Sequence, residues 1–350
     1  MKVFKYILIL LVVFLISGYF LVQNHSVQNK LFENTVRALF QTNEIFMNDA
    51  LSVAVCGSRA PLPSPNRAET CLLVQAGTSK FIIDTGRGSA DNLQRWRVDY
   101  SDLEAVILSH LHSDHISDLH EVQFQSWLGG RKTPLSVIGP IGTASTAQGF
   151  EQAFKLDSIY RSEHHGAILP IEAYGYDVVE FEGDAKLIFE NEDTRITAFK
   201  VDHAPVDPSY AFKIEYKDRS IVVSGDTVSL DVMTEYSKGV DVLFHDALAK
   251  PLIQEMEKIS EEIGNNIVSK VLFDIQDYHA NTVEVADIAR RAKVDLLVFY
   301  HLIPAPRNYI SEQMFLRGVD EIFTNYHVSE DGTLVSLPAG SDEILIDLID

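Results

Sequence analysis

Short apolar runs bounded by turn residues recur along the chain from about residue 50 onward. Clear examples are Leu51–Cys56, Thr70–Gln75, Phe81–Ile83 and Leu103–Leu108. Runs of about four to eight residues rich in Val, Ile, Leu and Phe are typical of buried β-strands. The segment from His279 is expected to open a helix that runs to about Lys293, with Asn281 or Thr282 as its capping residue. The pattern predicts a body of strands with helices between them.

The N-terminus follows a different pattern. Lys2 and Lys5 precede an uninterrupted apolar stretch from Tyr6 to Val22, which is at the short end of what spans a bilayer. The basic flank favours a cytoplasmic N-terminus with the rest of the chain exported. Ile16-Ser17-Gly18 is a poor cleavage site. An uncleaved membrane anchor is therefore favoured over a cleaved signal peptide, and a buried globular helix is the third interpretation.

Residues 23–48 are interpreted as a stalk. Leu31, Val36, Leu39, Phe40 and Phe46 have rough helical spacing, so part of this segment is expected to form an amphipathic helix. Such a helix could pack on the body, lie on a membrane surface or join two copies in a homodimer. The predicted organisation is a signal anchor or signal peptide (1–22), a stalk (23–48) and one catalytic domain (49–350). The predicted location is a bacterial-type periplasm, with the catalytic domain free or anchored to the cell membrane.

The overall composition is that of a globular protein, with 46% hydrophobic residues among 350. The formal net charge is −21, from 50 acidic against 29 basic residues. A strongly acidic chain repels polyanions at long range, and no dense basic patch is visible. We therefore expect a small-molecule substrate and regard a nucleic acid as an unlikely partner.

The chain contains two cysteines, Cys56 and Cys71, on the first two expected strands. Export would permit a disulfide between them, provided that the strand register brings the two Cα atoms within bridging distance. Without that register they would remain two buried thiols, and the sequence leaves both outcomes open.

The most informative segment is Ser109-His110-Leu111-His112-Ser113-Asp114-His115, directly after the strand Leu103–Leu108. His110 and His112 alternate, so they share a face of an extended segment, whereas Asp114 and His115 need a turn. Imidazole and carboxylate groups without a thiolate suit zinc, and less selectively manganese or iron. The segment therefore predicts a metal site at a strand end.

This His-x-His-x-Asp-His string resembles that of the metallo-β-lactamase superfamily. The family completes a two-metal site with three further residues, and His203, Asp226 and His301 follow apolar runs in the required order. The resemblance implies an α/β (α+β) fold, an αββα sandwich of two mixed sheets with outer helices, here preceded by the N-terminal apolar helix. It also implies two Zn²⁺ ions (Mn²⁺ or Fe as alternatives): one is held by His110, His112 and His203, the other by Asp114, His115 and His301, and Asp226 bridges them.

Asp84, in Asp84-Thr85-Gly86 after an apolar strand, resembles the family's carboxylate beside the metal-binding loop. Such a group would fix the tautomer and orientation of a ligating imidazole. On local grounds alone, a turn-forming aspartate before glycine explains it equally well.

Two further segments resemble the ribonuclease Z branch of the superfamily, which includes arylsulfatase-type hydrolases. Phe244-His245-Asp246-Ala247 and His279-Ala280-Asn281-Thr282 resemble its His-Glu-Ala-Thr and His-Ser-Thr elements. The chain departs from that branch at Asp246, which replaces Glu, and at Asn281. By resemblance, His279 protonates the leaving group and Asp246 orients it; a solvent-exposed His at a helix start is the alternative for His279. Asp114 is expected to act in catalysis as well as to bind metal.

The resemblance implies hydrolysis by a metal-bound hydroxide, which acts on many kinds of ester. The favoured function is an exported or membrane-anchored hydrolase of small phosphodiesters or aryl sulfates. The alternative is a ribonuclease Z-type tRNA 3′-end endonuclease; lactonase or β-lactamase activity and a non-enzymatic metal-binding role are less favoured. Only 23 positions separate His203 from Asp226, which leaves no room for the substrate arm of tRNA-processing members.

Overall fold

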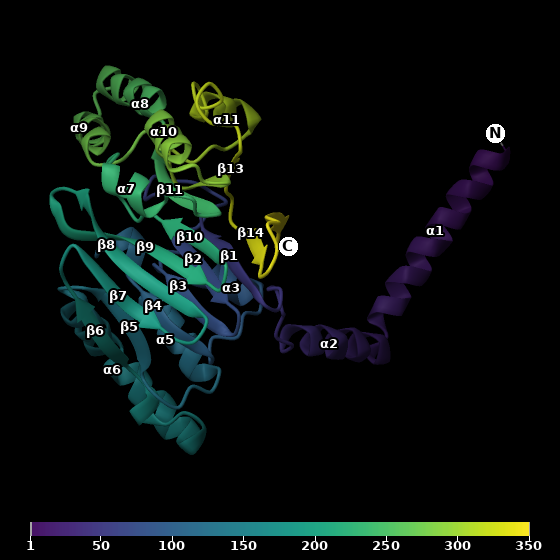
Figure 1. Cartoon of the computed structure of the whole chain (residues 1–350). Coiled ribbons are helices and arrows are strands. Elements are labelled where there is room, and N and C mark those ends of the chain that lie inside the picture. Colours follow the sequence, from purple (N-terminus) through teal and green to yellow (C-terminus); the bar gives the residue numbers. More distant parts are fainter. Residues whose placement is uncertain (1, 350) are drawn as a thin grey trace. The chain divides into compact units, whose positions relative to one another are not determined.

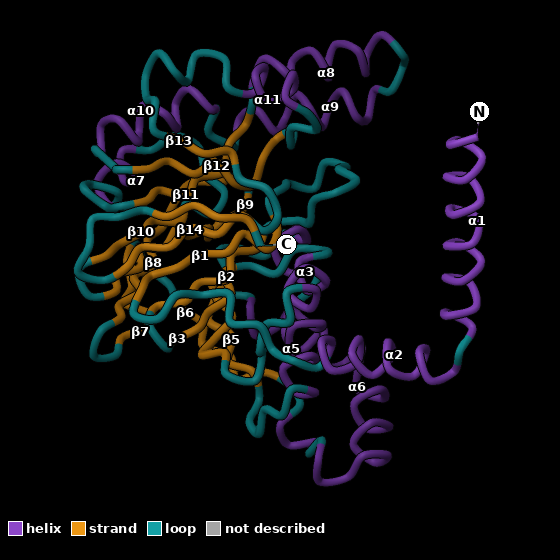
Figure 2. Tube along the Cα trace, turned by 90° about the vertical axis from the view of Figure 1, so that its right-hand side faces the viewer, coloured by secondary structure: helices purple, strands orange, loops and turns teal. Residues whose placement is uncertain are grey.

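The computed structural model describes residues 2–349 and divides the chain into two units, Met1–Asn43 and Glu44–Asp350. The second unit contains two mixed β-sheets (Figures 1 and 2). The first sheet has the strand order β15-β14-β1-β2-β3-β4-β5-β6 and the second has β13-β12-β11-β10-β9-β8-β7. The predicted fold of two mixed sheets with outer helices is confirmed.

The strands of the first sheet are β1 Ala50–Gly57, β2 Cys71–Ala76, β3 Ser79–Ile83, β4 Leu103–Ile107, β5 Leu135–Pro140, β6 Tyr176–Phe181, β14 Thr333–Pro338 and β15 Leu345–Leu348. Those of the second sheet are β7 Ala185–Glu190, β8 Thr194–His203, β9 Val206–Tyr216, β10 Arg219–Val223, β11 Val242–Leu248, β12 Leu296–Ile303 and β13 Tyr326–Val328. The helices of this unit are α3 Ser89–Arg95, α4 Ser113–Ile116, α5 Leu119–Leu128, α6 Thr143–His165, α7 Asp231–Tyr236, α8 Lys250–Glu262, α9 Asn266–Asp274, α10 Thr282–Ala292 and α11 Tyr309–Phe315.

Three apolar layers hold this unit together. The central layer lies between the two sheets and includes Val53, Phe81, Phe212 and Val298, all essentially inaccessible to water. A second layer packs the outer face of the second sheet against α7, α10 and α11, and a third packs the first sheet against α3 and α5. Because side chains alternate across a strand, each sheet can contribute to two layers at once.

Of the two capping residues that the sequence leaves open for helix α10, the structure uses Asn281. Asn281 caps it by accepting hydrogen bonds from the amides of Val283 and Glu284, and the Glu284 side chain accepts one from the Asn281 amide. This capping box satisfies amide groups that a helix start otherwise leaves without partners. It also fixes the direction in which the chain enters the helix, two residues after His279.

Cys56 and Cys71 form a disulfide, with their Cα atoms 5.0 Å apart. Strands β1 and β2 are antiparallel, and their register shifts between Val55 and Gly57. This irregularity places Cys56 beside Cys71. Of the two outcomes that the sequence leaves open, the structure has the bridge.

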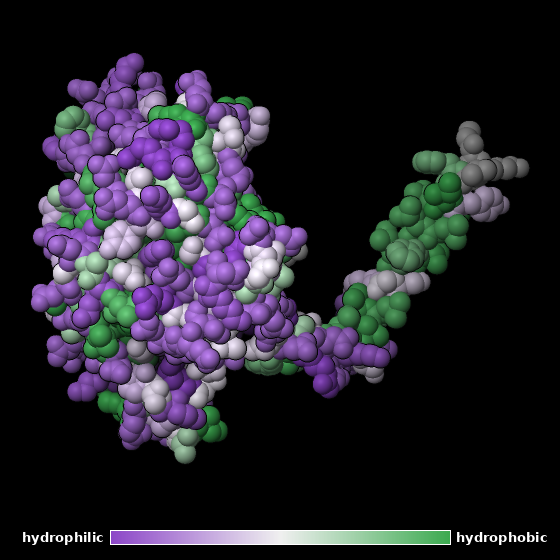
Figure 3. Space-filling model, viewed as in Figure 1, coloured by the Kyte–Doolittle hydropathy of each residue, from purple (hydrophilic) through white to green (hydrophobic). Residues whose placement is uncertain are grey.

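The first unit consists of α1 (Lys2–Gln23) and α2 (His25–Leu39). The segment Phe4–Gln23 is long and apolar enough to cross a membrane, a property that a signal sequence shares. Most of the α1 surface visible in Figure 3 is hydrophobic. Helix α2 contains no buried residue, and Asn24 caps its start by accepting from the amides of Ser26 and Val27. A helix is thus present within residues 23–48, where the sequence predicts one.

Candidate metal centre

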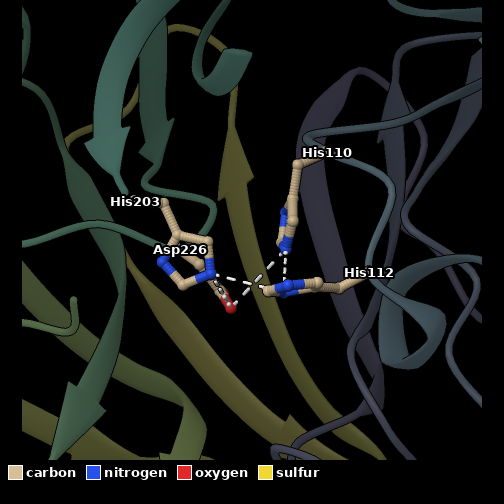
Figure 4. Close-up of side chains that lie close together, drawn as sticks. All are labelled: His110, His112, His203 and Asp226. Atoms are coloured by element: carbon tan, nitrogen blue, oxygen red, sulfur yellow. Dashed lines mark hydrogen bonds and ion pairs between the residues drawn. The ribbon is translucent and has the colours of Figure 1, made fainter. Parts of the chain in front are cut away.

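Seven side chains of the predicted ligand set converge at one edge of the two sheets. His110 and His112 lie in the loop after β4, and Asp114 and His115 lie on the single turn α4. His203 ends β8, Asp226 follows β10, and His301 lies within β12. In Figure 4, the side chains of His110, His112, His203 and Asp226 point toward one another. Four members therefore come from the first sheet and three from the second.

The carboxylate of Asp226 lies at the centre of the group. Its Oδ2 atom is surrounded by the Nε2 atoms of four imidazoles, those of His110 at 3.9 Å, His115 at 3.3 Å, His203 at 3.7 Å and His301 at 3.3 Å. The Oδ2 atom of Asp114 is 3.3 Å from His301 Nε2 and 3.6 Å from His115 Nε2. Asp226 can therefore contact both halves of the cluster.

On one side of Asp226 three imidazole nitrogens face one another. His112 Nδ1 lies 3.0 Å from His110 Nε2 and 3.4 Å from His203 Nε2. Burial lowers the pKa of each of these three histidines, and that of His110 lies well below its ordinary value. Neutral imidazoles keep a free lone pair, which is the form that binds metal.

The other side combines imidazoles with carboxylates. Burial alone would lower the pKa of His115, but Asp226, Asp84 and Asp114 outweigh it and raise that pKa well above its ordinary value. Burial raises the pKa of Asp114, whereas His115 and His301 lower it, to about 2. Asp226 Oδ1, His115 Nε2 and His301 Nδ1 are buried without a hydrogen-bond partner. A negative centre with unpaired donor atoms fits a divalent cation.

Two backbone irregularities set the direction of His301. Asp246 pairs with Tyr300 and Ala247 pairs with Leu302, so His301 is an extra residue in β12. A bulge of this kind redirects a side chain, and His301 has a φ of 45°. Non-glycine residues seldom adopt this left-handed conformation, and those that do often lie at functional sites. The sequence places His301 just after a strand, whereas the strand runs through it.

A second group of residues orients the imidazoles. The Asp84 carboxylate accepts from the Ser109 amide at 2.8 Å and from the Ser109 hydroxyl at 2.7 Å, and its Oδ2 is 2.7 Å from His115 Nδ1. His203 Nδ1 lies 2.9 Å from the Tyr278 carbonyl oxygen. The structure thus brings Asp84 into contact with His115. Ser109 and Tyr278 were not singled out from the sequence, although each directly precedes a predicted site histidine.

His279 and Asp246 form a pair beside the centre. His279 Nδ1 is 2.8 Å from Asp246 Oδ2, and His279 is largely buried rather than solvent-exposed. Burial raises the pKa of Asp246, but hydrogen bonds from His245 and His279 outweigh it and hold that pKa below its ordinary value. With Nδ1 engaged, His279 Nε2 is free to face a substrate. The shorter Asp in place of Glu still reaches His279.

Comparisons with known proteins identify the family. A family model described as Anti-Pycsar protein Apyc1 matches residues 56–291. Ribonuclease Z of Mycobacterium bovis (strain BCG / Pasteur 1173P2) is 35% identical over 261 residues, which cover 73% of this chain and 87% of the relative. The chain belongs to the ribonuclease Z family. It belongs equally to the family that the Apyc1 model describes.

Solved structures agree on the fold. The metallo-β-lactamase fold protein YhfI from Bacillus subtilis has a TM-score of 0.61 at 20% identity, covering 83% of this chain and 100% of its own. Human tRNase Z, short form, has a TM-score of 0.59 at 19% identity, covering 82% and 99%. As a member of the ribonuclease Z family, the chain is a metal-dependent hydrolase of phosphodiester or ester bonds.

Two predictions from the sequence are wrong. The favoured function, an exported hydrolase of small esters, is overturned by the curated relatives, which are ribonuclease Z and support the stated alternative. The prediction that a nucleic acid is an unlikely partner is wrong for the same reason, because ribonuclease Z relatives act on RNA. The net charge of −21 was a poor guide to the substrate because it is a sum over the whole chain. A bound phosphodiester contacts only the surface around the site. Of the described residues lining the cavity there, Asp114 and Asp226 are the only carboxylates.

Proposed function

We propose that this protein is a ribonuclease Z-type endonuclease that hydrolyses a phosphodiester bond at the 3′ end of precursor tRNA. The observation that carries the proposal is the Asp226-centred cluster beside the His279–Asp246 pair, in a chain 35% identical to ribonuclease Z. Reduced to its chemistry, the reaction adds water to phosphorus, breaks one P–O bond and transfers a proton to the leaving oxygen.

The proposed cofactor is a pair of Zn²⁺ ions. His110, His112 and His203 would hold one, Asp114, His115 and His301 would hold the other, and Asp226 would contact both. Divalent ions in such sites act as Lewis acids toward the phosphate and provide a nucleophile from water at neutral pH. The cluster supports this choice because it offers nitrogen and carboxylate oxygen atoms without a thiolate, a donor set that suits zinc.

His279 is proposed to give the proton to the leaving oxygen. The hydrogen bond with Asp246 fixes the ring with Nδ1 inward, so Nε2 is the atom available for proton transfer. A positioned acid of this kind typically contributes about 10²- to 10⁴-fold to the rate. Asp84 fixes the tautomer and ring direction of His115, and the Tyr278 carbonyl does the same for His203.

We also propose that α1 anchors the protein in a membrane. The apolar segment Phe4–Gln23 supports this, because it is long and apolar enough to cross a bilayer. The full-length protein should stay in the membrane fraction after a high-salt wash, whereas a variant without residues 1–23 should be recovered in the soluble fraction. Recovery of the full-length protein in the soluble fraction would contradict the anchor.

The enzymatic proposal is tested with a precursor tRNA that carries a 3′ trailer, supplied with zinc or manganese in separate reactions. We expect one cut at the junction of the acceptor stem and the trailer, and no cut by the Asp226→Ala variant. A tRNA without a trailer is the control substrate. Turnover of a chromogenic phosphodiester without cleavage of the precursor at this junction would overturn the tRNA assignment.

A further inference from the structure

A small cavity lies directly beside the candidate metal centre. Its volume is about 140 Å³, and His112, Asp114, Asp226, His279 and His301 form one side of it. The rest of the lining is mainly apolar and includes Leu62, Val271, Ile275, Tyr278 and Ile303. Pockets for drug-sized ligands usually measure about 300–1,000 Å³, so this cavity has room for a single ring system.

The apolar wall is fixed by buried packing. Ile275 and Leu272 of the α9 region pack with Ile253 of α8 and Ile303 of β12, and Leu62 and Tyr278 pack against this cluster. Leu62 belongs to a proline-rich loop that is held by Arg59, whose Nη1 atom donates to the carbonyl oxygens of Ala60 and Leu62. Arg59 itself is buried and paired with Glu69 at 3.0 Å. The wall is thus in place before a substrate arrives.

Tyr278 joins the apolar wall to the catalytic residues. Its ring centroid lies 5.1 Å from that of His203 and 5.0 Å from that of His279. The ring is half-buried, so one part of it is free to contact a ligand. Its backbone carbonyl is the group near His203 Nδ1, so side-chain replacements at this position leave that contact in place.

We propose that this cavity binds one nucleobase of the substrate, that of the nucleotide carrying the leaving oxygen, against Tyr278 and the apolar wall. The inference rests on the proposed function and names the substrate group that the cavity accepts. A base is a flat ring that stacks on aromatic and apolar surfaces. His279 lines the same cavity, which places this base next to the oxygen that receives the proton.

The composition of the wall also sets its selectivity. Among the described residues of the apolar wall, Tyr278 alone carries a polar group on its side chain. Stacking tolerates every base, whereas discrimination requires hydrogen bonds to base edges. We therefore expect the cavity to require a base but to distinguish poorly between bases.

The test compares precursor tRNA with the same RNA carrying an abasic residue on either side of the scissile phosphate. Tyr278→Ala should raise KM for intact RNA by about 5- to 150-fold, the range for loss of one stacked base, and Tyr278→Phe should restore most of the affinity. On the RNA that is abasic at the leaving-oxygen side, Tyr278→Ala should have little further effect. Zinc content should stay unchanged, and Tyr309→Ala, at a tyrosine that is 74% exposed and outside the cavity lining, is the matched control.

An equal loss by Tyr278→Ala on intact and abasic RNA would overturn the base site. If precursor tRNA is not cleaved at all, the proposed function fails separately. The cavity is then tested with two methyl phosphodiesters, one whose leaving group is a nucleoside and one whose leaving group is the same sugar without a base. A penalty from Tyr278→Ala confined to the nucleoside ester supports the base site, and an equal penalty on both esters overturns it.

Discussion

Asp84 provides a sharp test of how the chain controls its metal centre. Its carboxylate is inaccessible to water, accepts two hydrogen bonds from Ser109 and lies 2.7 Å from His115 Nδ1. Asp84→Asn keeps the size of the side chain, and Asn tolerates the φ of 58° at this position. With the amide oxygen on the Ser109 amide, the NH₂ group faces His115 Nδ1. This favours the tautomer with the proton on Nε2, which then has no lone pair for a cation.

The expected cost follows from the loss of one charge-assisted hydrogen bond. Such bonds contribute about 1.5–3 kcal/mol, and mutation of a residue that orients a ligand typically weakens metal binding about 10- to 100-fold. We expect a loss of that size at the proposed metal site containing His115 and a smaller one at the proposed site of His110, His112 and His203. Competition titration of the metal-free protein with a chromophoric chelator measures both sites.

Asp331→Asn is the matched control. Asp331 accepts hydrogen bonds from Ser58, Ala68 and Asn92 but lies outside the ligand cluster. Its replacement should lower the free energy of unfolding and leave both zinc affinities unchanged. Wild-type affinity at both sites of Asp84→Asn, or an equal loss in Asp331→Asn, would refute the role assigned to Asp84.

Three further predictions concern the site and its surroundings. Asp226→Ala should remove most bound metal, because Asp226 Oδ2 lies within 3.9 Å of four imidazole nitrogens; elemental analysis showing full occupancy would contradict this. His279→Ala should keep its metal but slow phosphodiesters with poor leaving groups about 10²- to 10⁴-fold; an equal slowing with good leaving groups would argue against proton transfer. Burial raises the pKa of Asp118 from 3.8 to about 6, so its stabilising contribution is present below pH 3.8 and lost as the pH rises through 6. Urea unfolding of the metal-free protein should then show Asp118→Asn gaining stability over wild type as the pH rises from 4 to 7.5, and a pH-independent difference would contradict this sign.

The local ligand pattern could be predicted because it depends on sequence neighbours. His110, His112, Asp114 and His115 follow one strand, and the spacing alone shows that two of them share a face while two need a turn. The position of His301 within its strand could not be predicted, because the bulge depends on the register between β11 and β12. The Cys56–Cys71 bridge depends in the same way on the shifted register of β1 and β2. Register is a property of the paired strands and is not visible in either segment alone.

The substrate was misjudged for a different reason. The net charge of the whole chain and the short interval between His203 and Asp226 both argued against an RNA substrate. Neither of them describes the side chains that surround the site. The wall formed by Leu62, Ile275 and Tyr278 combines a loop near residue 60 with a helical region near residue 275. No local pattern indicates that these distant segments meet, so neither the cavity nor its apolar character could be read from the sequence.

The division of the ligand set between the two sheets has a consequence for how the protein is assembled. His110, His112, Asp114 and His115 belong to one half of the sandwich, and His203, Asp226 and His301 belong to the other. Neither half alone brings together all the groups, so tight metal binding must await the docking of the two halves. Bound ions would then link the two halves. They would raise the free energy of unfolding by about 4 kcal/mol when the free metal concentration exceeds the dissociation constant a thousandfold. Metal supply would thereby set the lifetime of the folded enzyme as well as its activity.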